Sequence, residues 1–319
     1  MPLVSVCMKS YNHERFIAEA IESVLGQDFA NLELIIVDDA STDATRQIIE
    51  RYAKQDSRIR AIFHERNFGI SRTSNDGIAA AKGKFIAVID SDDVWIAHKL
   101  TKQLAVLERD EDLIVWSEGE VIDHAGRSIG KSFSELHGNT LAANNGGTLI
   151  FRKPSGDIWQ ELLWSNYIFD STVLYKKRNL GDVRYDEGIA FRNDFKFFLE
   201  LARRYQFHYI AEPLAKYRIH GDNASRGSDS EGLKRRRIGA EEDFSIVEDA
   251  MRQYGDEIPR ETRAAIYERM GSFYYSTGKT RKSLRFFLRA ITSNPLEKRN
   301  FRYLRLAFKR MLRAVSSHV

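Results

Sequence analysis

The sequence predicts an α/β fold, in which a mostly parallel sheet lies between helices, followed by an all-helical extension. Apolar runs of strand length alternate with segments of helical periodicity over residues 4–90, as in such sheets. Three of these runs end in clusters of polar side chains, and sheets of this class bind ligands at the carboxyl ends of their strands. After about residue 237 only helical patterns remain.

The first elements follow in chain order. Residues 4–8 are apolar and predict a buried strand, and Ser10-Tyr11-Asn12-His13 predicts a polar turn. Apolar residues at helical spacing over 16–25 predict a helix. A second apolar run, residues 32–37, predicts the next strand.

The pattern continues to Asp90. The polar residues that begin at Asp38 supply N-cap residues for a helix over about 44–54, and Asp38 itself is predicted to cap that helix. Residues 59–63 predict a third strand and residues 71–81 a helix. A fourth strand, from Phe85, then ends at Asp90.

Three carboxylates follow this fourth strand: Asp90, Asp92 and Asp93. Unpaired carboxylates this close together repel one another, and a bound cation would relieve the repulsion. The pattern therefore indicates a metal site at the edge of the sheet. The alternative is a polar turn that begins a helix, with Asp93 as the helix cap.

The middle of the chain, from about Asp112 to Tyr217, predicts an α+β arrangement. Residues 113–116 and 171–175 predict strands, residues 195–204 predict a helix, and Asn144-Asn145-Gly146-Gly147 predicts a loop. Residues 221–237 are rich in glycine, serine and charge, which predicts a domain boundary.

Composition narrows the class of protein. The chain has 319 residues, ordinary globular composition and no apolar run long enough to span a bilayer. No N-terminal signal is visible, and a single cysteine, Cys7, excludes an intrachain disulfide. These features predict a cytoplasmic protein.

Charge is distributed unevenly. Residues 279–319 contain twelve Lys or Arg and one acid, a balance of +11, which leaves −7 for residues 1–278 out of a total of +4. A basic tail on an acidic body predicts an anionic partner for the tail, with a membrane surface favoured.

The motifs together resemble family 2 glycosyltransferases, which are inverting enzymes with the GT-A nucleotide-diphospho-sugar transferase fold. The resemblance covers about residues 3–225. The matching segments are Val4-Ser5-Val6 with Ser10-Tyr11-Asn12, Val37 to Asp43, Asn67-Phe68-Gly69 with Asn75-Asp76-Gly77, Ala81 to Ile86, Asp90 to Asp93, Asn193-Asp194, and Tyr217 to His220 with Asn223 and Ser225.

The resemblance implies a set of site residues. Ser10, Tyr11, Asn12 and Asp39 would hold the nucleoside. Asp90-Ser91-Asp92 looks like the family's DXD motif, which implies Mg²⁺ or Mn²⁺ as the cofactor. Asp92 would bind the metal, with Asp90 contacting the ribose or the metal through water. His220 matches a histidine near the metal or the diphosphate.

Asp194 matches the family's catalytic base. The reaction needs such a base because a sugar hydroxyl must lose its proton as it attacks the anomeric carbon. Asp194 is alternatively the N-cap of the following helix, and both roles can hold together. Two positions depart from the family pattern. At the position of Asn193 many relatives have an acidic residue, and at the position of Ser74 many have an arginine. Arg72 is a candidate diphosphate contact, on a different helical face from Ser74.

The tail resembles one tetratricopeptide repeat, a helix–turn–helix, over about residues 264–297. A basic amphipathic helix is predicted over 301–315; it is either a packed last helix or an interfacial membrane helix. The predicted domains are 1–225 for catalysis, 226–263 as linker and connecting helix, and 264–319 for the helical tail. No nucleic-acid-binding module is recognisable.

The predicted function is metal-dependent transfer of a sugar, with inversion, from a nucleotide-diphosphate donor, UDP-sugars being favoured, to a hydroxyl of a glycan or lipid-linked acceptor. The predicted place of action is the cytoplasm or the inner face of the membrane. Two alternatives are a nucleotidyltransferase of related fold, against which the absence of a Gly-rich phosphate loop counts, and a non-catalytic scaffold that acts through the tail.

Overall fold

The structure is a computed structural model that describes residues 3–110, 112–136, 154–221, 223, 230–296 and 301–309. The chain forms two compact units, Met1–Glu242 and Asp243–Val319. The loop predicted at 144–147 and the last part of the predicted terminal helix, residues 310–315, lie outside the described residues. None of the described helices combines the length and the hydrophobicity that a membrane span requires.

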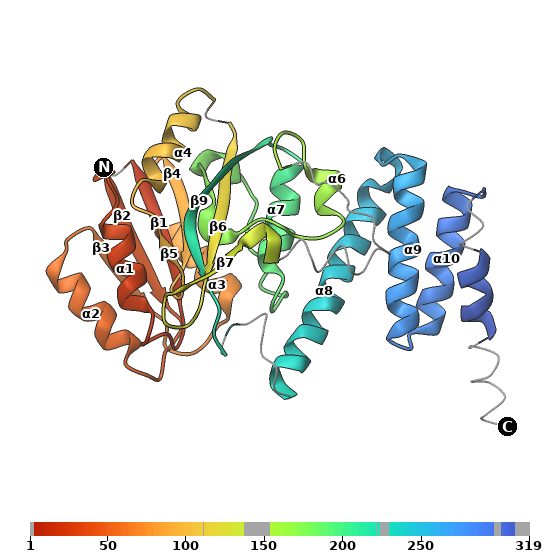
Figure 1. The fold of residues 1–319 in the computed structure, drawn as a ribbon, viewed down its shortest axis with the longest axis horizontal. Helices are drawn as coiled ribbons and strands as arrows, with labels where there is room; N and C mark the ends of the chain where they lie inside the picture. The colour runs from red at the N-terminus through yellow and green to blue at the C-terminus, as the bar shows by residue number, and fades with distance from the viewer. Residues whose placement is uncertain are drawn as a thin grey trace. The chain divides into compact units, whose positions relative to one another are not determined.

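A nine-stranded mixed sheet organises the first unit (Figure 1). Its order is β3-β2-β1-β4-β8-β6-β9-β5, and β7 pairs with β6. Within the group β1 to β4, each pair of neighbouring strands is parallel. Strand β8 is antiparallel to its neighbours β4 and β6, and β5 is antiparallel to β9. The strands are β1 (Val4–Ser10), β2 (Leu32–Asp38), β3 (Ile59–Phe63), β4 (Phe85–Asp90), β5 (Val94–Trp95), β6 (Ile114–Ile122), β7 (Ser128–Ser132), β8 (Leu174–Lys176) and β9 (Phe207–Arg218). The predicted α/β class is therefore confirmed.

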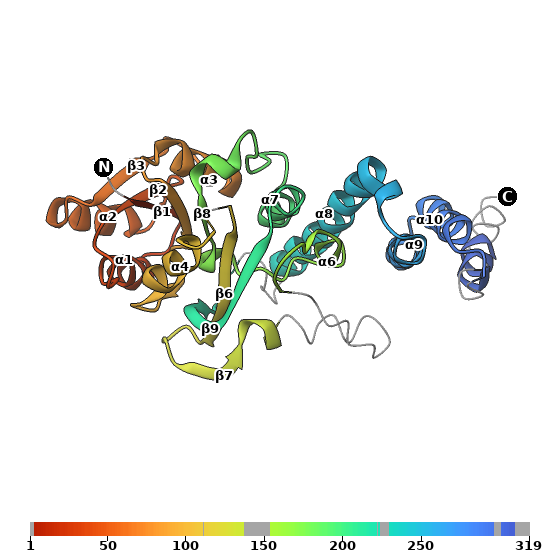
Figure 2. The same ribbon diagram turned by 90° about the horizontal axis from the view of Figure 1, so that it is seen from above.

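Helices cover both faces of this sheet (Figure 2). Alternate residues of β1 separate the two faces: Val6 joins a core cluster with Ile17 and Leu100, whereas Cys7 faces Gly77. The helices of the first unit are α1 (Ile17–Leu25), α2 (Thr45–Gln55), α3 (Ile70–Ala80), α4 (Lys99–Leu107), α6 (Trp159–Leu162), α7 (Asn193–Ala202), and the short η1 (Asp170–Thr172) and η2 (Lys177–Leu180). Burial on both faces explains why the strands read as continuous apolar runs.

The register of the parallel strands brings three predicted polar clusters to one edge. Ser10 at the end of β1 lies opposite Asp38 at the end of β2, and Lys9 lies opposite Asp90 at the end of β4. The carboxyl ends of these strands thus meet at a single lip of the sheet.

One predicted element differs from the structure. The strand predicted at 171–175 is a 3-10 turn at Asp170–Thr172 followed by the three-residue β8, because Ser171 and Thr172 use their hydroxyls in local and site hydrogen bonds. The segment predicted as a boundary, 221–237, already contains the start of α8 (Ser230–Tyr254). The basic residues Lys234 to Arg237 lie on this helix.

The second unit is helical. After η3 (Gly255–Glu257), α9 (Arg260–Ser276) and α10 (Thr280–Ser293) form the predicted helix–turn–helix, with Gly278 at a φ of 79° in the turn. Gly271 lets the two helices approach, since a Cβ there would lie 2.7 Å from the Phe287 ring. Residues 301–309 form a further helix.

Candidate functional site

The turn after β1 is tied to the loop after β2. Asn12 has a φ of 52°; its N–H donates to Ser41 Oγ (2.9 Å), and its side-chain oxygen accepts from Thr42 N–H (2.8 Å). Tyr11 is 44% exposed beside them. Ser10 Oγ is buried and has no hydrogen-bond partner within the described residues. A buried hydroxyl without a partner is a position at which a ligand can donate or accept.

Asp38 does not cap the next helix, so that prediction is wrong. Its carboxylate accepts from the N–H (3.0 Å) and the hydroxyl of Ser41, while α2 begins only at Thr45. The loop between them is too long for a direct cap, and Asp38 instead orders this loop.

Asp39 lies at the same edge and is almost fully buried. It accepts from the N–H groups of Phe68 and Gly69 (2.8 Å each) and contacts His64 Nδ1 (2.7 Å). A carboxylate offers about four acceptor positions, so one remains for a ligand.

A polar chain extends from Asp39 to Arg72. His64 Nε2 lies 3.1 Å from Asp76, and Arg72 Nε donates to the same carboxylate (2.8 Å). Arg72 is half exposed while Ser74 is buried, which confirms that they occupy different faces of α3.

Asp90 is held by a buried lysine. Lys9 Nζ lies 2.9 Å from Asp90 and also pairs with Asp170. Burial raises the pKa of Asp90 to about 7. The negative charges of Asp92 and Asp170 also raise this pKa, whereas the positive charge of Lys9 lowers it. Because a third of the Asp90 side chain is exposed, contact with solvent limits this rise.

Asp92 is held in the charged form. Although burial acts to raise the pKa of Asp92, the hydrogen bond from His220 and the charges of His13 and His220 lower it below its usual value. His220 Nε2 lies 3.0 Å from the carboxylate, and Asn223 donates to it at 3.3 Å. Ser91 contacts His13 Nδ1 at 2.8 Å.

Asp93 is not a helix cap, and that alternative is wrong. It accepts from Ser171 Oγ (2.5 Å) and from the N–H of Arg218 (3.1 Å) beneath the site. Helix α4 begins six residues later, at Lys99. Arg218 is a scaffold residue, buried and bonded to the Asp92 carbonyl (2.9 Å).

Two overlapping groups of side chains could hold a cation. His13, Asp92 and His220 have ligand atoms within 4.8 Å of one another, and so have Asp90, Asp92 and Asp93. Asp92 belongs to both groups. Carboxylate and imidazole donors suit a divalent cation such as Mn²⁺, and a carboxylate set also suits Mg²⁺.

Asp194 lies in the first turn of α7, which begins at Asn193. Its two oxygens accept from Asn166 Nδ2 and from the N–H of Phe195, both at 2.8 Å. Burial, followed by the charge of Asp170, raises the pKa of Asp194 to about 6, against Arg192 and Lys9. These charges link Asp194 to Asp90 through the shared neighbours Lys9 and Asp170.

The segment that leads into α7 is fixed by α8. Glu242 accepts from the N–H groups of Ala190, Phe191 and Arg192 at 2.8, 2.9 and 3.1 Å. The first part of α8 therefore supports the segment that ends at Asp194.

Sequence reasoning missed several polar groups of this edge. His13 follows the predicted turn directly, and a lysine at the end of a buried strand, Lys9, is itself a signal of an internal ion pair. Asp170, Asn166 and Glu242 carry no local signal, because their partners lie far away in the sequence.

Comparison with known proteins identifies the class. The structure resembles S. aureus TarS residues 1–349 with a TM-score of 0.60 at 19% identity, covering 97% of this chain and 88% of that one. A structure titled as the same protein in complex with UDP-GlcNAc gives a TM-score of 0.59 at 18% identity, covering 98% and 92%. The sheet and these likenesses define a protein with the GT-A fold.

The sequence comparisons are more specific. The family described as Glycosyl transferase family 2 matches residues 5–159. The putative teichuronic acid biosynthesis glycosyltransferase TuaG of Bacillus subtilis (strain 168) is 32% identical over 227 residues, 70% of this chain and 82% of that protein. The Escherichia coli UDP-Glc:alpha-D-GlcNAc-diphosphoundecaprenol beta-1,3-glucosyltransferase WfgD is 39% identical over 122 residues, 38% of this chain and 47% of that protein. The chain belongs to glycosyltransferase family 2 and is an enzyme of that class.

Proposed function

We propose that this glycosyltransferase is metal-dependent and inverting, and that it moves a sugar from a UDP-sugar to a hydroxyl of a glycan or lipid-linked acceptor. The observation that carries the proposal is the arrangement of Asp90 and Asp92 beside two histidines. Asp194 is influenced by the charges of Lys9 and Asp170, which also act on Asp90. Similar proteins support the donor and the acceptor: TarS has a complex with UDP-GlcNAc, and WfgD is named for a diphosphoundecaprenol substrate.

The nucleoside would occupy the turn that contains Ser10, Tyr11 and Asn12, with Asp39 behind it. Among the described residues the Ser10 hydroxyl has no hydrogen-bond partner and Asp39 has one acceptor position left, and both support this role. Arg72, half exposed on the same polar chain, would contact the diphosphate. Ser91 would act through its contact with His13 rather than by touching the donor.

The divalent cation, Mg²⁺ or Mn²⁺, would be held by Asp92 with His220, His13 and Asp90. When bound, it would supply charge neutralisation for the departing nucleoside diphosphate. Burial, and after it the charges of the neighbouring aspartates, raises the pKa of Asp90 and Asp93, which fits a site completed by a cation.

Asp194 would act as general base. It takes the proton of the acceptor hydroxyl while that oxygen bonds to the anomeric carbon and the bond to the diphosphate breaks, which inverts the anomeric centre. A raised pKa suits this task, since a stronger base takes the proton more readily. Asn166 and the Glu242-anchored segment would fix the direction of its carboxylate.

The proposed function is tested by incubating the purified chain with UDP-, GDP- and dTDP-sugars, with Mn²⁺, Mg²⁺ or EDTA. We expect donor hydrolysis for one nucleotide class, dependent on metal, and retention of the anomeric configuration in the sugar as it is released would contradict the inverting mechanism. Turnover that is unchanged in EDTA would contradict the proposed dependence on a divalent metal.

The pH dependence of turnover follows from the pKa of Asp194. A general base acts as the carboxylate, so kcat/KM should be constant well above the pKa of about 6 and should fall about tenfold per pH unit below it. Asp90, with a pKa of about 7, changes its protonation in the same pH range. Rates are therefore measured at saturating Mn²⁺, so that the metal site stays filled at every pH. A parent profile that stays flat through this range would contradict Asp194 as the base.

We further propose that the chain acts at the inner, cytoplasmic face of the membrane through its last helix. In the described part of this helix, Phe301, Leu306 and Phe308 are 49%, 42% and 50% exposed. Exposed basic residues, Arg302, Arg305 and Lys309, lie among them. This combination is typical of interfacial binding to anionic lipid.

The membrane proposal is tested by cosedimentation with phosphatidylglycerol vesicles, using neutral vesicles as the control. Deleting residues 301–319 should abolish binding. Replacing Arg302, Arg305 and Lys309 by glutamine should weaken it and leave donor hydrolysis unchanged. Equal sedimentation of the parent and the deletion variant would remove this proposal.

A further inference from the structure

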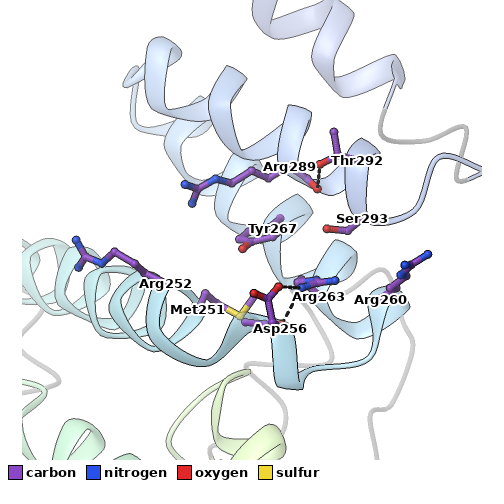
Figure 3. Close-up of a pocket in the computed structure, with 10 residues that line it drawn as sticks. Met251, Arg252, Asp256, Arg260, Arg263, Tyr267, Arg289, Thr292 and Ser293 are labelled. Atoms are coloured by element: carbon purple, nitrogen blue, oxygen red, sulfur yellow. Dashed lines mark hydrogen bonds and ion pairs between the residues drawn. The ribbon is translucent and has the colours of Figure 1, made fainter.

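The second unit contains a polar pocket of about 540 Å³, lined by residues of α8, η3, α9 and α10 (Figure 3). The guanidinium groups of Arg252 and Arg289 point to one side of it, and that of Arg260 points to the opposite side. Arg263 lies between them and pairs with Asp256. Because these cationic groups do not converge, the pocket does not define a ligand.

Polar groups do converge in the first unit, where the 3-10 turn η1 meets the segment from Asp90 to Asp93. Ser171, in the middle of this turn, is fully buried. Its hydroxyl accepts a hydrogen bond from the N–H of Asp90 (3.0 Å) and donates one to the carboxylate of Asp93 (2.5 Å). One side chain therefore touches both ends of the segment that carries the proposed cation ligands.

Asp170, the residue before Ser171, holds the same segment through a lysine. Lys9 Nζ pairs with Asp170 and lies 2.9 Å from the carboxylate of Asp90. The side chains of Lys9 and Asp170 are each only 9% exposed, so their attraction is screened little by solvent. Asp170 and Ser171 thus fix the side chain and the main chain of Asp90 from one short turn.

The other end of the segment is also held by β9. Asp93 accepts a second hydrogen bond from the N–H of Arg218 (3.1 Å), and Arg218 Nε donates to the carbonyl of Asp92 (2.9 Å). The main chain is therefore fixed on either side of the Asp92 carboxylate, which lies 3.0 Å from His220 Nε2. A ligand held in this way needs little reorganisation when a cation binds.

We propose that Ser171 is a positioning residue for the cation site. It acts through Asp90 and Asp93, by fixing the turn that presents the Asp92 carboxylate, and does not touch the cation itself. This inference rests on the proposed function, because it takes Asp92 as the metal ligand. Residues that hydrogen-bond to metal ligands contribute about 10–100-fold to metal affinity, so the loss of the Ser171 hydroxyl should weaken Mn²⁺ binding by about that factor.

Thr172 provides a matched control in the same turn. It is fully buried too, and its hydroxyl accepts from the N–H of Ser117 (3.3 Å) and donates to the carbonyl of Phe169 (2.6 Å). Ser171→Ala and Thr172→Val therefore each remove one buried hydroxyl that accepts once and donates once. Both variants should lose similar stability, but only Ser171→Ala loses bonds to the segment from Asp90 to Asp93.

The test measures the thermal stabilisation of the full chain as Mn²⁺ increases at a fixed, saturating concentration of UDP, with melting in EDTA as the baseline of each variant. The midpoint for Ser171→Ala should lie at about 10–100-fold more Mn²⁺ than that of the parent, and the midpoint for Thr172→Val should stay near the parent. The Mn²⁺ concentration for half-maximal donor hydrolysis should rise by the same factor in Ser171→Ala, with a near-parental maximal rate. If Ser171→Ala does not fold, Ser171→Cys, whose thiol bonds more weakly, replaces it, and its midpoint should also rise.

Asp92→Asn separates the two proposals. Equal midpoints for the Ser171 variant and Thr172→Val, together with a lost response in Asp92→Asn, would overturn the role of Ser171 and leave the proposed metal site in place. A parental response in Asp92→Asn would overturn the metal site itself, and this inference with it.

Discussion

Replacing Asp194 by asparagine should lower the kcat/KM of sugar transfer, or of donor hydrolysis, by about 10²–10⁴-fold. Asparagine keeps the shape of the side chain and its single oxygen can still accept from Asn166 or from Phe195, but it cannot take a proton. Because the nucleotide would contact other residues, the affinity for UDP with Mn²⁺ should stay near that of the parent. Initial rates and calorimetric titration with UDP measure the two effects separately.

A matched control is Asp182→Asn. Asp182 precedes α7, is 83% exposed and pairs with Arg204. Its replacement should change neither rate nor affinity. Near-parental turnover in Asp194→Asn would assign the base to another residue. Loss of UDP binding together with turnover would indicate a structural role for Asp194.

The sheet edge could be predicted because its signals are local. Each apolar run is followed directly by its polar cluster, so the sequence alone predicts Ser10, Asp39 and Asp90 at strand ends. The register that brings Ser10 opposite Asp38 confirms the arrangement. Periodicity reports burial within a strand or helix, and it was sufficient for this part of the fold.

The partners of these residues could not be predicted, because they come from distant parts of the chain. Lys9 pairs with Asp170 across 161 residues, and Asp93 accepts from Ser171 across 78. The helix-cap prediction for Asp93 failed because a nearby helix was the only partner that the local sequence offered. Glu242 supports the Asp194 segment from within a helix whose first turns were read as a boundary.

The division into domains remains a prediction. The compact units meet at residues 242 and 243, whereas the sequence suggested 225 and 263 as boundaries. Limited proteolysis of the full chain would locate the accessible segment. The contacts of Glu242 indicate that the beginning of α8 should stay with the catalytic unit.

Replacing Asp92 should have the second large effect, on metal-dependent donor binding. Asp92 is the residue common to both candidate ligand groups, and its carboxylate is kept charged by His220. Changes beside a metal ligand cost about 10–100-fold in metal affinity, so loss of the ligand itself should cost at least that much. Thermal stabilisation of the parent by Mn²⁺ with UDP should therefore disappear in Asp92→Ala.

Asp92→Asn separates this loss from misfolding, because the amide oxygen can still accept from His220 and Asn223, whereas alanine removes that acceptor. The asparagine variant should melt near the parent in EDTA and fail to gain stability with Mn²⁺ and UDP. Asp112→Ala, which removes a carboxylate that is 63% exposed and pairs with Arg178, is the control and should respond as the parent does. If Asp92→Asn is stabilised by Mn²⁺ and UDP as strongly as the parent, the cation is held elsewhere, and the assignment of this edge as the donor site is wrong.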